Sequence, residues 1–346
     1  AAPPPPPASQ DPATMAEAAI AGADPLLRDL PDEVVIWEIL VRLDPKSLLR
    51  YCAVPRAWRR ATSTRRFLLA HHTGHPVLPI ATGQDEGDNR FYRSILTFDH
   101  WAADAQLQHV TRLDDPFSRL EASCDGLMLL RSYDTTYFSI CNPATRQCAR
   151  LPIPSDFIVY GMYPHHPSGE YRILLYDENP EKSGDDACYI FVVGSVQPPR
   201  NIRWQPEARD ACYGNGEAVL LRGNLHWSVN PVEVGSNTIV VFDTTAESFR
   251  AMRAPVALFV PCYNHLFEID GVLGMYSYGH TATTINIWVL PDYESEVTTL
   301  KCRIDLLVTE IEGLCGNYQS SRYVVVLPGN GDLFVLGRFG DCLQHN

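Results

Sequence analysis

The sequence lacks any run of about 18 apolar residues, the length that a membrane-spanning helix requires. It begins with alanines and the proline run Pro3–Pro7, not with the charged and then apolar order of a secretory signal. It also lacks an Asn-x-Ser/Thr glycosylation site. These absences predict a protein without a membrane segment that works in the cytoplasm, the nucleus or both.

The ten cysteines include no Cys-x-x-Cys pair. The closest two, Cys141 and Cys148, have no matching pair of His or Cys residues, so their spacing does not predict a zinc site. A disulfide framework is the alternative, but scattered cysteines favour reduced, mostly buried thiols in a cytosolic or nuclear protein. We therefore expect ten free thiols.

Catalytic motifs are missing as well: there is no G-x-S-x-G, H-E-x-x-H or G-x-x-x-x-G-K-[ST]. Two polar pairs, His165–His166 and Asp185–Asp186, lie in predicted loops, and adjacent residues of a strand face opposite ways, which disfavours a shared metal. The segment Gly329–Asp332 is predicted to be a tight turn, because no helix follows it to bind a phosphate. We expect no catalytic residue, metal or cofactor.

The charge is uneven. The net charge is −13, but the segment Leu30–His72 holds eight Lys and Arg against four Asp and Glu. That segment is therefore +4 and the rest of the chain −17. An acidic protein of this kind repels phosphates, so a nucleic-acid partner is not expected.

The chain divides into three zones: a Pro/Ala-rich tail (1–25) expected to be disordered, a helical zone (26–75) and a long zone (76–346). In the helical zone, Asp29 suits the N-cap of a first helix. Pro45 and Pro55 each stop one helix and open the next. A short piece with the sequence STRRFLLAHH ends a set of three or four helices.

The first of these helices is unusually apolar, at eight of the ten positions from Val34 to Leu43. Its spacing predicts two apolar faces, composed of Val34, Trp37, Leu40 and Val41 on one side and of Val35, Ile39 and Leu43 on the other. One face can pack on the neighbouring helices. So small a zone buries too little surface to be stable alone. The second face is expected to contact either the long zone or another protein.

The long zone is rich in short β-type runs bounded by turn residues, such as RILLY, YIFVV, TIVVF, INIWVL and YVVVL. A phrase of Gly, a small or polar residue, Leu and an apolar residue recurs at Gly126, Gly223, Gly271 and Gly331. A second strand with an Asn/Asp/Pro turn follows the first three at 14, 17 and 16 residues. A repeat of about 45–50 residues is typical of a propeller blade, which predicts five or six blades. An irregular β-sandwich is the alternative.

The helical zone resembles the F-box. The stretch LPDEVVIWEILVRLDPKSLLRYCAVPRAWRR, followed by FLLAHH, matches that family's order of residues over about forty positions. The matching residues are Leu30, Pro31, Asp32, Glu33, Ile39, Leu40, Arg42, Leu43, Pro45, Ser47, Leu48, Val54, Arg56, Trp58, Arg59, Phe67 and His71. Pro55 departs from the pattern, where a small residue is usual, but proline is tolerated at the start of a helix.

The long zone resembles the plant F-box-associated β domain through the phrases ICNPATRQCARLP, GNLHW, IVVFDTTAESFRAM and IWVLPDYE. Together the two resemblances imply an α+β multidomain chain, with a three-helix F-box before an all-β propeller-like domain. They imply a non-enzymatic substrate receptor of a Skp–cullin–F-box ubiquitin ligase. The F-box would dock on a Skp-type adaptor, and through it on a cullin-RING ligase, while the β domain would bind an unidentified target protein.

The resemblance also implies which residues contact the adaptor: Leu30, Pro31, Glu33, Val34, Trp37, Ile39, Leu40, Leu43, Ser47, Leu48, Val54 and Trp58. Of the aromatic residues of the long zone, Trp227, Trp288, Tyr278 and Tyr293 could line a recognition surface, although the two tryptophans are better explained as core between blades. Two alternatives stay open. One is a propeller-fold hydrolase or lectin with an accessory helical hook, and the other is an F-box protein that binds the adaptor but serves no ligase.

Overall fold

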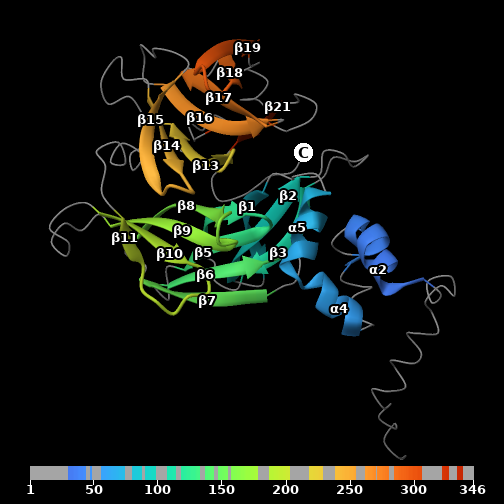
Figure 1. The fold of residues 1–346 in the computed structure, drawn as a ribbon. Helices are drawn as coiled ribbons and strands as arrows, with labels where there is room; N and C mark the ends of the chain where they lie inside the picture. The colour runs from blue at the N-terminus through green and yellow to red at the C-terminus, as the bar shows by residue number, and fades with distance from the viewer. Residues whose placement is uncertain are drawn as a thin grey trace, which may run out of the picture. The chain divides into compact units, whose positions relative to one another are not determined.

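A computed structural model describes most of the helical zone and of the strands that follow it. The described residues are 30–43, 47–48, 56–74, 80–87, 90–98, 107–113, 118–132, 137–143, 147–154, 157–177, 187–202, 218–228, 238–254, 262–269, 271–279, 284–305, 322–326 and 333–337. The predicted tail, residues 1–25, lies outside them. The chain forms two compact units with a boundary between Val77 and Leu78, called here the helical unit and the β unit (Figure 1).

The helical unit begins with one unbroken helical segment that changes type along its length. Two further helices follow it. The elements are α2 (Asp32–Val34), the π-helical turn η2 (Val35–Ile39), the 3₁₀ turn η3 (Leu40–Arg42), α4 (Arg56–Thr62) and α5 (Arg65–Thr73). Ser47 and Leu48 are the described residues of the predicted second helix, and both are helical. The helix α4 begins directly after Pro55, as predicted.

The first helix begins later than the sequence predicts. Pro31, not Asp29, occupies the N-cap position, with an extended backbone at φ −56° and ψ 138°. The backbone amides of Val34 and Val35 both donate to the carbonyl oxygen of Pro31, at 2.9 and 3.1 Å. Proline lacks an amide hydrogen, but its carbonyl can still accept the first bond of the helix.

The π-helical turn changes which side chains share a face. A π turn contains more residues than an α turn, so it rotates the following side chains relative to the preceding ones. Val34 is 39% exposed, whereas Leu40, predicted on the same face, is 1% exposed. The predicted grouping of Val34 with Leu40 on one face is therefore wrong.

The β unit consists of antiparallel sheets whose strands follow one another in chain order. Four of the sheets have four strands each. The first two are β4 (Arg119–Cys124), β5 (Leu127–Ser132), β6 (Tyr137–Asn142) and β7 (Gln147–Pro154), and then β8 (Ile158–His165), β9 (Glu170–Asp177), β10 (Ala187–Val192) and β11 (Arg200–Ile202). The next two are β12 (Val219–Leu221), β13 (Asn224–Ser228), β14 (Thr238–Asp243) and β15 (Ser248–Arg253), and then β16 (Cys262–Ile269), β17 (Val272–Gly279), β18 (Thr284–Asp292) and β19 (Val297–Asp305). A three-stranded sheet precedes them and a two-stranded sheet follows: β1 (Ile80–Gly87), β2 (Arg90–Phe98) and β3 (Leu107–Leu113), then β20 (Arg322–Val326) and β21 (Leu333–Gly337).

The recurring glycine phrase marks the same hairpin in successive sheets. Gly126, Gly223 and Gly271 each lie in the turn between the first and second strands of their sheet, with φ of +77°, +73° and +74°. Glycine adopts this backbone region without the steric strain that a Cβ atom introduces. The repeat predicted from the sequence is therefore confirmed at these three turns, while Gly331 lies outside the described residues.

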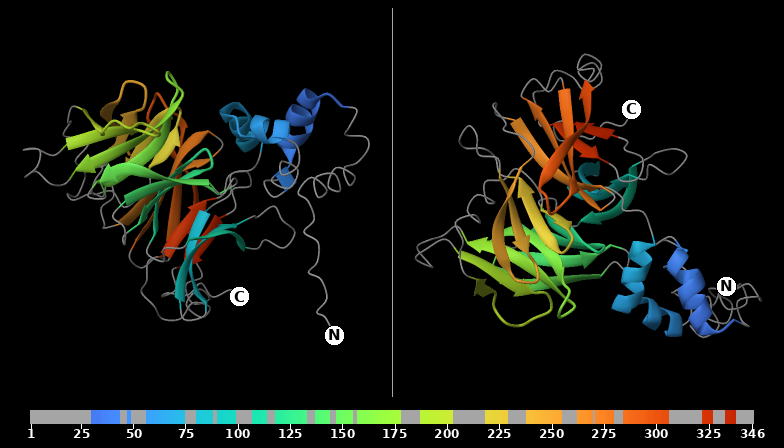
Figure 2. Two further views of the ribbon diagram at one scale, coloured as in Figure 1. Left: turned by 90° about the horizontal axis from the view of Figure 1, so that it is seen from below. Right: turned by 45° about the horizontal axis from the view of Figure 1, so that its top comes forward.

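The four-stranded sheets are joined in chain order by shared apolar cores. One core combines Leu129 and Phe138 with residues of β8–β10, and a second combines Tyr163 and Leu174 with Trp227 of β13. A third core places Val241 of β14 with side chains of β17 and β18. The sheets thus stack face to face in succession, an arrangement that Figure 2 shows from two further sides. This is the propeller-like architecture that the repeat predicted.

The expectation of ten free thiols does not hold. Cys141 and Cys148 form a disulfide between β6 and β7, while Cys124, Cys188 and Cys302 are not disulfide-bonded. The two bonded cysteines are direct partners in the strand register, which brings their side chains together on one face of the sheet. Sequence spacing alone could not show that pairing.

Candidate partner-binding site

The helical unit is built around one small apolar core. Val35, Ile36 and Leu40 of the first helical segment pack there with Leu48 and Phe67. Phe67, on α5, is fully buried, and its ring lies 5.8 Å from that of Trp37. This core fixes the position of the first helical segment against α5, and thereby sets which of its side chains face outward.

Polar contacts hold the same segment at both of its ends. At the start, the indole Nε1 of Trp58 donates to Asp32 Oδ1 at 3.0 Å. At the end, His71 Nε2 lies 2.7 Å from the carbonyl oxygen of Leu43, so the ring nitrogen donates to it. The guanidinium of Arg66 lies 4.5 Å above the ring of Trp37. These contacts use three residues of the F-box pattern, Asp32, Trp58 and His71, inside the unit.

The N-terminal end of the segment leaves apolar side chains uncovered. Leu30 is 40% exposed and Val34 is 39% exposed, and they are two of the five large exposed apolar residues in the described part of the chain. Pro31 and Glu33 between them are also exposed. Single exposed apolar residues are ordinary on a protein surface, but two of them four positions apart at one end of a segment make that end a candidate contact surface.

The structure separates the twelve residues predicted to contact an adaptor into three groups. The exposed residues are Leu30, Pro31, Glu33 and Val34; the half-buried ones are Trp37, Ile39, Leu43, Ser47 and Trp58; and the buried ones are Leu40 and Leu48. Val54 lies outside the described residues. Leu40 and Leu48 belong to the core of the unit itself, so the candidate contact surface is the uncovered end formed by Leu30, Pro31, Glu33 and Val34, called here the LP end.

In the β unit, the aromatic residues considered for a recognition surface mostly hold sheets together. Trp227 is 3% exposed and its indole Nε1 donates to the carbonyl oxygen of Tyr160 in the preceding sheet, at 3.1 Å. Trp288 is half-buried and borders a small apolar cavity with Leu266 and Met275. The side chain of Tyr278 lies outside the described part. Trp227 is therefore a core residue between sheets, as its sequence context favoured.

Tyr293 is also internal, in a buried hydrogen-bonded cluster. Its hydroxyl donates to His226 Nε2 at 2.7 Å, since His226 Nδ1 donates to the carbonyl oxygen of Val219. Arg250 donates to the same Tyr293 hydroxyl at 3.1 Å. Burial, with the nearby positive charge of Arg250, lowers the pKa of His226 to about 4, so this imidazole is neutral in the folded protein. The cluster joins two sheets and offers no exposed catalytic group.

Sequence reasoning missed a set of ion pairs that also bridge neighbouring sheets. Glu247, in the turn after β14, binds Arg172 and Arg200 of the preceding sheet. Glu296, in the matching turn after β18, lies 3.5 Å from Arg250 of the sheet before it. Both glutamates have positive φ of +52°. The signal that could have found them is the acidic residue four positions after the aspartate that opens each turn.

The polar pairs considered for metal binding or catalysis do not converge. His165 Nδ1 lies 2.8 Å from Ser168 Oγ, which donates to Glu170 Oε2 at 2.7 Å, while His166 is exposed. Asp185–Asp186 and Gly329–Asp332 fall outside the described residues. Within the described ranges, no three His, Cys, Asp or Glu side chains group as metal ligands. None of the helices that the structure describes is long and apolar enough to cross a membrane.

Comparison with known proteins agrees with this architecture. Residues 27–69 match the F-box domain, and residues 84–305 match the F-box associated beta propeller domain. The chain belongs to the family of F-box proteins with this β-propeller domain. F-box domains generally bind Skp-type adaptors, and F-box proteins are generally non-catalytic adaptors.

The similar proteins include curated plant relatives and a solved propeller. The Arabidopsis thaliana F-box protein At5g49610 is 24% identical, over 85% of this chain and 84% of its own length. The F-box protein At3g22700 of the same plant is 21% identical, over 90% of this chain and 96% of its own. The solved β-propeller domain of Myceliophteria thermophila Cps50 (Swd1) is 10% identical, covers 77% of this chain and 88% of its own, and has a TM-score of 0.36.

Proposed function

We propose that this chain is the substrate-recognition subunit of a Skp–cullin–F-box ubiquitin ligase. The helical unit docks on a Skp-type adaptor through the LP end, and the β unit binds the target protein. The chemistry of ubiquitin transfer takes place on other subunits. The single observation that carries the proposal is the exposure of Leu30 and Val34 at the one stretch of the chain where the F-box pattern begins.

The packing of the helical unit supports this assignment. Its interior already uses Val35, Ile36, Leu40 and Phe67, so the exposed Leu30 and Val34 are not needed for that core. Burying both side chains in a complex would remove apolar surface from water, which favours binding by about 25 cal/mol for each Å². Covering the LP end with an apolar partner surface is therefore energetically favourable.

A pull-down of a Skp-type adaptor with the full chain tests the proposal. The double variant Leu30→Ala/Pro31→Ala removes apolar contact, and Val34→Asp places a carboxylate in it. An unpaired carboxylate buried in an interface costs several kcal/mol, and each 1.4 kcal/mol is about a tenfold loss of affinity. We expect Val34→Asp to weaken binding by about 100-fold or more, and the double variant to weaken it less.

The matched control is Val297→Asp, which changes another exposed valine, 62% exposed, on β19 of the β unit. It should bind the adaptor like the unchanged protein. Wild-type binding by both LP-end variants would contradict the proposed docking surface. Loss of the adaptor in Val297→Asp would show that exposed apolar residues affect binding without regard to their place.

Ligase assembly needs a separate measurement. When the full chain is mixed with adaptor, cullin and RING subunits and the mixture is separated by size, the chain should elute with the cullin only if the adaptor is present. The Val34→Asp variant should elute apart from the cullin even with the adaptor present. A chain that binds the adaptor but never elutes with the cullin would instead support an F-box protein that serves no ligase.

A further inference from the structure

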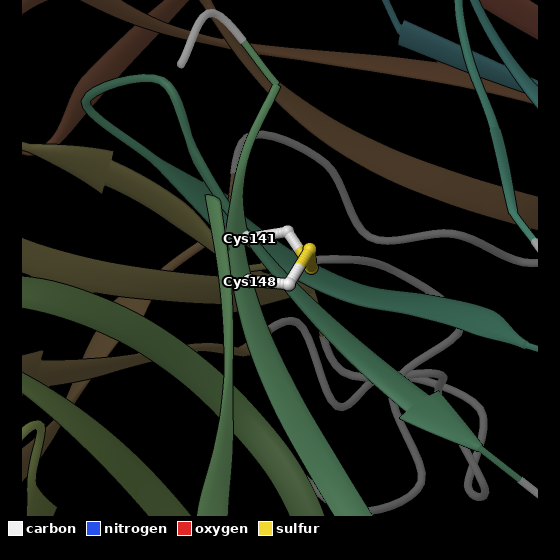
Figure 3. The surroundings of a disulfide bond; sticks show 2 residues. All are labelled: Cys141 and Cys148. Carbon is white, nitrogen blue, oxygen red and sulfur yellow. A yellow bond between two sulfur atoms is a disulfide. The ribbon is translucent and has the colours of Figure 1, made fainter. Parts of the chain in front are cut away.

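The hairpin of β6 and β7 holds the two bonded cysteines at its closed end. Cys141 and Cys148 are register partners next to the pair Asn142 and Gln147, where the turn begins. Figure 3 shows their side chains pointing toward each other from the two strands. Cys141 is 5% exposed and packs in a core with Met128 and Leu130, whereas Cys148 is exposed to solvent. One sulfur is thus sheltered and the other is on an accessible residue.

The equivalent hairpin two sheets later has a different pair at this place. There, the turn lies between Asp243 and Ser248, and the register partners just before it are Phe242 and Phe249. Their rings are 4.8 Å apart and both are buried. Such an aromatic pair across two strands stabilises a hairpin without a covalent bond. The β6–β7 hairpin has no aromatic pair at the matching position, and two thiols alone are a weaker substitute.

We propose that Cys141 and Cys148 form a reversible redox-modification site, oxidised by a low-molecular-weight disulfide such as glutathione disulfide, that locks the β6–β7 hairpin. The oxidised hairpin has a covalent bond where the β14–β15 hairpin has two phenylalanine rings packed against each other at a tilt. The reduced hairpin has neither, so its strand ends open more readily. This inference does not depend on the adaptor role of the helical unit.

The chemistry balances as two thiol–disulfide exchanges. The thiolate of Cys148, on the exposed residue, attacks one sulfur of glutathione disulfide and displaces a glutathione thiolate, which leaves a mixed disulfide on Cys148. The thiolate of Cys141 then attacks the Cys148 sulfur and displaces the second glutathione. The two protein thiols are oxidised, glutathione disulfide is reduced to two glutathione molecules, and the two thiol protons pass to the glutathione thiolates. An excess of glutathione reverses both steps.

Trypsin makes the bond directly measurable, because the sequence places Arg146 between the two cysteines. Cleavage after Arg131, Arg146 and Arg150 yields the peptides 132–146 and 147–150, each with one of the cysteines. The two peptides stay joined only through the disulfide. The full chain is reduced, equilibrated with mixtures of glutathione and glutathione disulfide, alkylated, digested and analysed by mass spectrometry without reductant. We expect the joined peptide to form with glutathione disulfide and to disappear in excess glutathione. A joined peptide that never forms, or that excess glutathione never releases, would overturn the proposal.

Hydrogen exchange on the same samples tests the effect on the hairpin. The amides of β6 and β7 nearest the turn should exchange at least about tenfold more slowly in the oxidised chain than in the reduced one. The β14–β15 hairpin, held by Phe242 and Phe249, should not respond to redox state. The variant Cys141→Ala/Cys148→Ala should lose the response, and Cys302→Ala, which removes a separate exposed thiol, should keep it. Equal exchange of β6 and β7 in both redox states would show that the bond locks nothing.

Discussion

The helical unit and the β unit bury their apolar side chains in different ways. The described part of the helical unit has one core of five buried apolar side chains and leaves Leu30 and Val34 exposed beside it. The β unit repeats its cores from sheet to sheet and joins them with hydrogen bonds such as that from Trp227 to Tyr160. A structure with repeated, linked cores can be stable without a bound partner protein. A small core with exposed apolar side chains at one end gains stability when a partner protein covers them.

The largest expected effect is the loss of the helical unit in Leu40→Asp. This side chain is 1% exposed, so the carboxylate would lie in an apolar core without an ionic partner. We expect about 3–5 kcal/mol of destabilisation, which exceeds what so small a unit can lose. Hydrogen exchange of the full chain should show α5 unprotected, while β9 and β14 keep their protection.

Val34→Asp is the matched comparison, since it introduces the same group at a position that is 39% exposed. It should leave α5 protected and remove only the adaptor. If Val34→Asp unfolded the helical unit as Leu40→Asp does, the distinction between a core and an uncovered end would fail.

A second large effect is expected at the joint between sheets. Trp227→Ala removes a nearly buried indole and its hydrogen bond to Tyr160, which should cost about 3–5 kcal/mol in the free energy of unfolding. Urea unfolding followed by circular dichroism at the β signal measures it. Trp288→Ala, at a half-buried site beside a cavity, should cost less. Equal losses would mean that Trp227 contributes no more than an ordinary half-buried tryptophan.

The sequence allowed much of this arrangement to be predicted, because its strongest signals are local. The turn at Gly126 is an example, because a glycine in the left-handed backbone region followed by an apolar strand gives the same sequence pattern in each repeat. The F-box pattern likewise predicted the family. The π-helical turn that begins directly after Val34 has no simple sequence signal. The bonds of Glu247 and of Cys141 depend on strand register and on neighbouring sheets, which a single sequence does not reveal.

The pH dependence of the β unit adds to this comparison, because the buried cluster of His226, Tyr293 and Arg250 joins two of its sheets. The pKa of His226 is lowered to about 4 in the fold, from an ordinary value of 6.5. The His226 imidazole therefore binds a proton below pH 6.5 in the unfolded chain, but only below about pH 4 in the folded chain. The contribution of His226 to the free energy of unfolding is therefore fully present above pH 6.5 and is lost as the pH falls. At pH 4 the loss from this residue is about 3 kcal/mol.

The measurement is urea unfolding of the full chain at pH 7, 5.5 and 4, compared with His226→Gln, which cannot titrate. The variant should be less stable at pH 7, because it loses part of the cluster with Tyr293 and Val219. The gap between the two proteins should shrink as the pH falls. A constant gap would mean that the protonation of His226 is not linked to folding.

The smallest effects are expected at the ion pairs between sheets, and they should differ with burial. Glu247→Gln keeps the shape of the side chain but leaves Arg172, whose side chain is 14% exposed, with only the more exposed carboxylate of Glu170, 3.4 Å away. We expect a loss of about 1–2 kcal/mol, because a largely buried charge loses its nearer anionic partner. Glu296→Gln affects a looser pair, 34% and 43% exposed, and its amide oxygen can still accept from the Arg253 amide. That variant should lose at most about 1 kcal/mol, and the loss should vanish at high salt. Urea unfolding at low and high salt separates the two, and a salt-sensitive loss at Glu247 as small as that at Glu296 would show that the Glu247 pair is screened by solvent despite its burial.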